Sequence, residues 1–274
     1  MPYPTVSAPY GLRPVNMVGG QPYAGSTRMY NIPYGYDTDI FYGDLIGLVR
    51  GQVNRLSVST GTLGTVAGVF MGCSFTDPLT KQKRFSQYWP ASTLAGDAIA
   101  YVVDDPDAVF RIAVCSATTV IASAARAMIG QNLAMINNTG DTASGNSRNA
   151  ALAPNDTPAT TDALPLRVVG LVESTAVSLG TATYTSINTA TVTCSALPNA
   201  LVVGTDVGSI AANGQYVASG SFVDTAANAA ATTFVMNQAP LATLNSTLVF
   251  TQYPEVLVKL NFGQHEYYAA TATA

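Results

Sequence analysis

Short apolar runs recur along most of the chain, separated by glycine and other turn-forming residues. Two runs, 83–89 and 256–262, alternate between the two faces as a half-buried strand does. Runs of this length at this spacing predict an all-β protein, built as a small barrel or a sandwich. The strands expected from the pattern are 39–44, 45–49, 53–58, 66–71, 83–89, 99–103, 109–114, 166–172, 190–194, 200–203, 215–218, 232–236, 247–251 and 256–262.

Residues 1–36 are rich in proline and tyrosine. Proline fixes φ and lacks a donor, so we expect extended backbone here, with neither a helix nor a central strand. Tyrosine suits a contact surface because it offers a large area at low rotamer entropy. The segment is either an arm laid on a partner or a coil wrapped over its own core. The expected contact residues are Tyr3, Tyr10, Arg13, Tyr23, Arg28, Tyr30 and Tyr34.

One short helix is predicted within 118–130, after the expected strand at 109–114. Val120, Ala124 and Met128 form one row at i, i+4 spacing, and the row beside it is equally apolar. A threonine at 118 or 119 would cap its start, and Gly130 would end it. Because Arg126 is its only charge, we expect the core or a partner to cover the helix.

The character of the chain changes between 174 and 253. These residues carry only two charges, Asp206 and Asp224. We interpret 174–253 as a small β subdomain inserted into a main domain of 37–173 plus 254–274, since surface turns tolerate insertions. The alternative is a plain extension of one sandwich. A polar stretch at 137–163 is expected to be a long loop.

The charge balance argues against two classes of partner. Twelve Lys and Arg stand against 16 Asp and Glu, for a formal net charge of −4, so a broad nucleic-acid-binding face is not expected. No run of 18 apolar residues predicts a membrane span, and the first residues do not read as a secretory signal. The three cysteines are far apart and are expected to be buried, reduced thiols.

Few residues suggest catalysis or metal binding. Asp104, Asp105 and Asp107 place three carboxylates in four residues, but Pro106 favours a simple turn over a cation site. His265 is the only histidine, and no nucleophile elbow, phosphate-binding loop or HExxH motif accompanies it. We therefore expect no catalytic residue, no metal and no cofactor. The acidic residues leave a glycan-cleaving enzyme as the least favoured alternative.

Several segments resemble one family. They are GLRPVN at 11–16, GSTR at 25–28, GVFMGCSFTDP at 68–78, FSQYWP at 85–90, YVVDDP at 101–106, the strand at 166–172 and FGQHEY at 262–267. Together they resemble head decoration (cement) proteins of tailed bacteriophages, over most of 1–173 and 254–274. The expected insert does not match.

The resemblance implies a function and a set of partners. Such proteins are β-rich, usually trimeric, and bind the outside of the capsid, where they clamp neighbouring capsomers. It therefore implies a virion structural protein made in the host cytoplasm, with the major capsid protein and its own copies as partners. A head fibre, tail or baseplate protein is the alternative. A major capsid protein is not favoured, because no long spine helix is expected.

Overall fold

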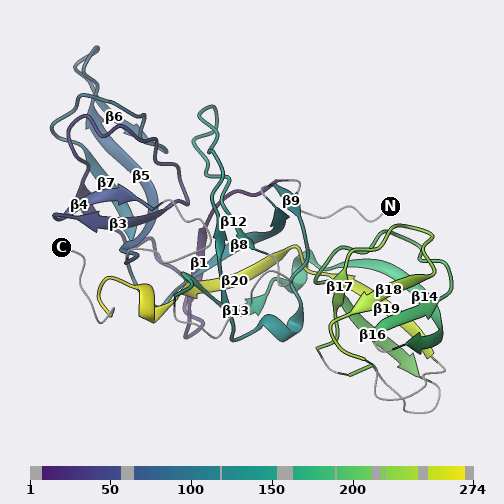
Figure 1. Cartoon of the computed structure of the whole chain (residues 1–274). Coiled ribbons are helices and arrows are strands. Elements are labelled where there is room, and N and C mark those ends of the chain that lie inside the picture. Colours follow the sequence, from purple (N-terminus) through teal and green to yellow (C-terminus); the bar gives the residue numbers. More distant parts are fainter. Residues whose placement is uncertain are drawn as a thin grey trace.

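The fold was analysed in a computed structural model, which describes residues 8–56, 65–117, 119–152, 163–188, 190–211, 217–218, 220–239 and 246–268. The fold class predicted from the sequence is confirmed, because nearly all of the regular secondary structure in these ranges is β-strand. Three groups of strands lie side by side in Figure 1: one at the left, one in the centre and one at the right. Each has its own sheet and its own cluster of buried apolar residues.

The first group, which we call barrel 1, is a closed ring of five strands with a sixth at its side. The ring follows the order β3–β4–β2–β7–β5, and β3 also pairs with β5, which closes it. Trp89 is fully buried in its core, edge-on to Phe75. Its strands are β2 (Arg28–Asn31), β3 (Leu45–Val49), β4 (Gln52–Arg55), β5 (Gly68–Thr76), β6 (Lys83–Ser86) and β7 (Ile99–Val103).

The central sheet is organised around one long strand, β8. This strand pairs with four partners along its length: β1 and β20 near its start, β9 and β12 near its end. The sheet packs on the largest buried cluster of the described residues. Its strands are β1 (Arg13–Met17), β8 (Ala108–Ala117), β9 (Val120–Ile121), β10 (Asn132–Leu133), β11 (Met135–Ile136), β12 (Ala150–Leu152), β13 (Leu166–Leu171) and β20 (Glu255–Leu260).

The third group, barrel 2, is formed by six strands that pair only with one another in the described ranges. Their order is β16–β19–β14–β15–β18–β17, and a bridge between Asp206 and Phe222 brings the two ends of the sheet together. Phe234 and Phe250 meet edge to face inside it. The strands are β14 (Val177–Asn188), β15 (Thr191–Cys194), β16 (Asp206–Ala211), β17 (Val223–Thr225), β18 (Thr233–Met236) and β19 (Ser246–Gln252). All six lie within 174–253, the range expected to be an insert.

The predicted short helix is wrong. Val120 and Ile121 form strand β9, and only Arg126–Met128 makes a single 3₁₀ turn, η1. The three alanines between them are almost fully buried, so they pack on the core in extended backbone. Two further 3₁₀ turns, η2 (Glu173–Thr175) and η3 (Phe262–Gln264), complete the helical segments of the described residues.

The expectation that no central strand runs through 1–36 is wrong for β2, whereas β1 is an edge strand. Strand β1 pairs with β8, and Pro14 is tolerated because β1 has no other strand partner and bulges directly after this residue. Strand β2 contains no proline and lies between β4 and β7 in the closed ring. Residues 1–7 lie outside the described residues. The expected loop at 137–163 likewise contains a strand, β12.

Candidate docking surface

The residues expected to contact a partner lie mostly against their own chain. The Tyr10 hydroxyl donates to Glu255 Oε1 at 2.6 Å, and burial, followed by this carboxylate, raises the pKa of Tyr10. The Arg13 guanidinium lies 4.0 Å from the centre of the Tyr42 ring, and it donates to Asn146 at 2.8 Å. Tyr10 thus ties the N-terminal segment to β20, and Arg13 ties it to the segments that precede β3 and β12.

Arg28 and Tyr30 belong to a second internal cluster. Arg28 Nε lies 2.6 Å from Asp104 Oδ2, which also accepts the hydroxyl hydrogens of Tyr267 at 2.6 Å and Tyr30 at 3.2 Å. Burial raises the pKa of Tyr267, and the bond to Asp104 adds to that effect. The cluster fastens the C-terminal segment to barrel 1, so these side chains have a structural task within the chain.

Three members of the expected set remain. Tyr23 is half-buried and donates to the Ser26 carbonyl at 2.6 Å. Tyr34 is 68% exposed, which leaves its ring open to a partner. Tyr3 lies outside the described residues. Most of the set thus helps to hold the fold, and of the described members Tyr34 and more than half of the Arg28 side chain stay exposed.

His265 is a fully buried structural residue. Its Nδ1 accepts the backbone N–H of Tyr267 at 3.2 Å, and its Nε2 lies 3.1 Å from the carbonyl of Asp104. Because a carbonyl only accepts, Nε2 carries the hydrogen and the ring is neutral. Burial lowers the pKa of His265, in agreement with this arrangement. Both ring nitrogens are occupied by the backbone, so neither is free for proton transfer.

The acidic turn at 104–107 is also held by its own chain. Asp105 accepts the backbone N–H of Asp107 at 2.9 Å, and Asp107 lies 3.7 Å from Lys259. In the part of the chain that the structure describes, no three His, Cys, Asp or Glu side chains are placed to hold a metal ion. The carboxylates thus serve turn formation and ion pairing.

The three cysteines are buried free thiols, one in each group of strands. Burial raises the pKa of Cys73 and Cys115 to about 12, and it also raises the pKa of Cys194. A thiolate is the reactive form, so these groups are poor nucleophiles at neutral pH.

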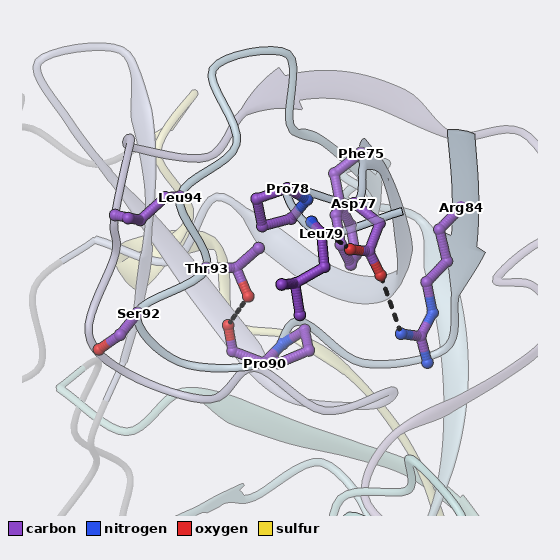
Figure 2. Close-up of a pocket in the computed structure, with 9 residues that line it drawn as sticks. All are labelled: Phe75, Asp77, Pro78, Leu79, Arg84, Pro90, Ser92, Thr93 and Leu94. Carbon is purple, nitrogen blue, oxygen red and sulfur yellow. Dashed lines mark hydrogen bonds and ion pairs between the residues drawn. The ribbon is translucent and has the colours of Figure 1, made fainter. Parts of the chain in front are cut away.

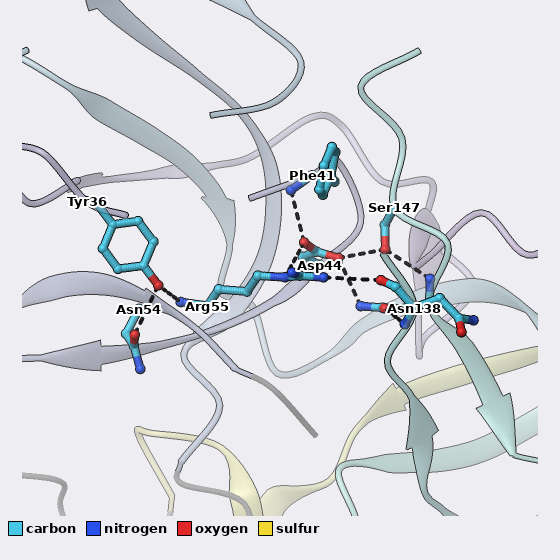
Figure 3. A network of polar contacts seen from close by, with 8 residues as sticks. Tyr36, Phe41, Asp44, Asn54, Arg55, Asn138 and Ser147 are labelled. Atoms are coloured by element: carbon cyan, nitrogen blue, oxygen red, sulfur yellow. Dashed lines mark hydrogen bonds and ion pairs between the residues drawn. The ribbon is translucent and has the colours of Figure 1, made fainter. Parts of the chain in front are cut away.

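A fully buried carboxylate, Asp44, joins barrel 1 to the segment that enters β12 (Figure 3). Its Oδ1 accepts Ser147 Oγ at 2.6 Å and Asn149 Nδ2 at 2.9 Å. Its Oδ2 accepts the Phe41 N–H at 2.9 Å and lies 2.8 Å from Arg55 Nε. Burial raises the pKa of Asp44, and Arg55 opposes the rise. Because Arg55 belongs to β4 while Ser147 and Asn149 precede β12, the network acts as an internal joint.

An open apolar surface lies at the tip of barrel 1, around the connection between β5 and β6. We call this feature the tip; its members are Asp77, Pro78, Leu79, Lys81, Arg84 and Leu94. Leu79 is 91% exposed and Leu94 is 57% exposed. They line an open hollow of about 470 Å³ together with Phe75, Pro90, Ser92 and Thr93. Figure 2 shows Leu79 standing between Pro78 and Asp77 on one side and Thr93 and Pro90 on the other.

The turn that carries Leu79 is tightly held. Asp77 Oδ1 accepts the backbone N–H of Leu79 at 2.8 Å and that of Thr80 at 3.2 Å. The Asp77 carbonyl accepts the N–H of Lys81 at 2.9 Å, and Lys81 has φ 58°, a left-handed conformation that costs energy outside glycine. The bonds from the Leu79 and Thr80 N–H groups to its carboxylate lower the pKa of Asp77. An apolar side chain is therefore presented to solvent on a rigid support.

No protein-family model matches the chain, and neither the curated proteins nor the solved structures contain a match to it. Among the described residues, no helix is long and apolar enough to cross a membrane.

The sequence interpretation missed the tip as a contact surface. It treated Asp77-Pro78 only as the start of a turn, although a leucine directly after an Asp-Pro pair is exposed when that turn projects from a barrel. Asp44 carried no distinguishing signal, since its partners at 147 and 149 are a hundred residues away in the chain.

Proposed function

We propose that this protein is a virion structural protein that binds the outside of a tailed-phage capsid and clamps neighbouring capsomers. It acts without catalysis. Its partners are the major capsid protein and its own copies, as a homotrimer, and it is located on the capsid surface after synthesis in the host cytoplasm.

One observation carries this proposal: the chain holds an exposed leucine rigidly outward at the tip, while the side chains with catalytic potential are occupied internally. Leu79 is supported by the bonds to Asp77, and His265 and Asp44 are bonded to their own chain. A rigid apolar anchor lowers the entropy cost of binding a protein surface. This combination favours a binding protein over an enzyme.

The shape of the molecule supports a clamp. Two barrels flank a central sheet (Figure 1), so opposite ends are available to different neighbours. The segments that resemble decoration proteins, such as 68–78, 101–106 and 262–267, lie in or against barrel 1 and the central sheet. None of them lies in barrel 2, which we propose projects away from the shell.

The copy number in purified particles tests the proposal. Quantitative mass spectrometry, with the major capsid protein as the reference, gives the copy number of this protein. It should correspond to one copy, or one trimer, at each local symmetry site of the shell. A few copies per particle would overturn the decoration role and favour a head fibre, tail or baseplate protein. Complete absence from particles would contradict any virion role.

A further inference from the structure

We propose that the tip of barrel 1 is the end that engages the partner, and that it seats in an apolar hollow rimmed with carboxylates. The choice of the capsid shell as the partner rests on the proposed function. The chemistry of the recognised surface follows from the tip itself.

The anchor of this contact is Leu79. Burying a leucine side chain is worth about 1.5–3 kcal/mol, and here nearly all of that area is still in water. The Asp77 turn already fixes the backbone, so little conformational freedom is lost on binding. Leu94 and Pro78 extend the apolar area around the anchor. The hollow in a partner must therefore be apolar at its centre.

The charged residues around Leu79 indicate which charge the rim of the partner's hollow carries. Residues 76–97 carry three of the 12 basic residues but only two acidic ones, Asp77 and Asp97, whereas the whole chain has a net charge of −4. Lys83 pairs with Asp97 at 2.9 Å, and Arg84 lies 3.8 Å from Asp77. This local excess of positive charge is complementary to carboxylates, which steer association and fix the orientation of binding.

The long ion pair between Arg84 and Asp77 leaves Arg84 available to a partner. Arg84 is more than half exposed, and its distance from Asp77 makes the pair weak. Exchanging Asp77 for a carboxylate of the partner costs little, because exposed pairs contribute about 0–1 kcal/mol. Lys81 closes the same turn and is exposed. The tip thus offers an apolar centre with cations beside it.

Affinity measurements with matched variants test the inference. Wild-type protein and three variants are titrated onto shells stripped of this protein, in low and high salt. Leu79→Asp should weaken binding by at least about 30-fold, and Lys81→Glu by about fivefold in low salt and less in high salt. Ile210→Asp, at a residue of barrel 2 that is 66% exposed, should leave the affinity unchanged. Unchanged unfolding midpoints would show that the variants fold.

The outcomes separate the inference from the proposed function. Wild-type binding that survives Leu79→Asp overturns the inference and leaves the proposed function standing. Failure of wild-type protein to bind shells overturns the proposed function, and sedimentation of wild type and Leu79→Asp then shows whether the tip binds a second copy instead. Self-association abolished by the variant would make a second copy the occupant, which contradicts the inference as stated. Identical sedimentation would overturn it as well.

Discussion

In each of the two barrels the ends of a sheet come together, but the barrels are attached to the central sheet in different ways. Barrel 1 contributes Leu45, Val66, Val69 and Val103 to the buried central cluster, and Asp44 adds a network of buried polar bonds. Barrel 2 contributes Phe222, which is only partly buried there. The difference suggests that barrel 1 folds together with the central sheet, whereas barrel 2 is a separable module.

The joint at barrel 2 is exposed and polar. Arg126 donates its backbone N–H to Asp206 at 3.0 Å, and its side chain reaches Glu173 at 3.3 Å and the Tyr253 hydroxyl at 3.0 Å. The guanidinium is half exposed, so these contacts are weakened by water and salt. Such a weak joint is consistent with barrel 2 being a module attached to an otherwise complete fold.

The largest expected effect is the loss of the Asp44 joint. Asp44→Ala leaves Arg55, Ser147 and the Phe41 N–H without their shared acceptor in a buried site, which should cost about 3–5 kcal/mol. Chemical denaturation should show that barrel 1 and the central sheet lose stability together. The matched control is Asp206→Ala at the other joint, and equal effects of the two variants would break the comparison.

A core truncation in barrel 2 should act locally. Phe234→Ala removes a buried ring that packs against Phe250 and should cost barrel 2 about 3–5 kcal/mol. Thiol labelling under native conditions gives the measurement, because Cys194 lies in barrel 2 and Cys73 in barrel 1. Labelling should accelerate at Cys194 alone. Parallel acceleration at Cys73 would mean that the barrels unfold as one unit.

The pH dependence of stability should reveal the buried histidine. The pKa of His265 is lowered by burial, so the unfolded chain binds more protons than the folded one between the two pKa values. The contribution of His265 is fully present above about pH 6.5 and is lost as the pH falls from there toward the lowered pKa. Thermal unfolding of wild type and His265→Gln from pH 7.5 to pH 5 measures it. The variant should have a flatter profile, and identical slopes would refute the assignment of a neutral ring.

The smallest expected effect concerns Arg126. Arg126→Ala should lower the unfolding free energy by less than about 1 kcal/mol, because an exposed ion pair contributes little. Denaturation in low and high salt measures it, and the difference from wild type should shrink in high salt. A loss as large as that of Asp44→Ala would contradict the view of this joint as a weak one.

The sequence was most informative where side chains are branched and strongly apolar. The expected strands at 45–49 and 99–103 coincide with β3 and β7, because Ile, Leu and Val recur there beside glycine or charged residues. The long strand β14 was missed because it is built from Thr, Ser, Gly and Ala, which also characterise loops. Its partner β19 is distant in the sequence, so no local pattern predicts their pairing.

The site was less predictable than the fold. The row of Val120, Ala124 and Met128 has helical spacing, but small residues pack equally well in extended backbone against β8 and the core. The tyrosines of the N-terminal segment were recognised as contact residues, yet their contacts are mostly internal. Exposure of Leu79 depends on where the turn projects from a closed barrel, and this is set by the whole ring of strands.

The most direct test of the account is a cryo-electron microscopy reconstruction of the virus particle at a resolution that shows strands. The account predicts a protein on the outer surface of the shell, with the tip of barrel 1 against the capsid and barrel 2 directed outward. Density for barrel 2 against the shell, with Leu79 in solvent, would contradict the central claim. So would a shell that does not carry the protein.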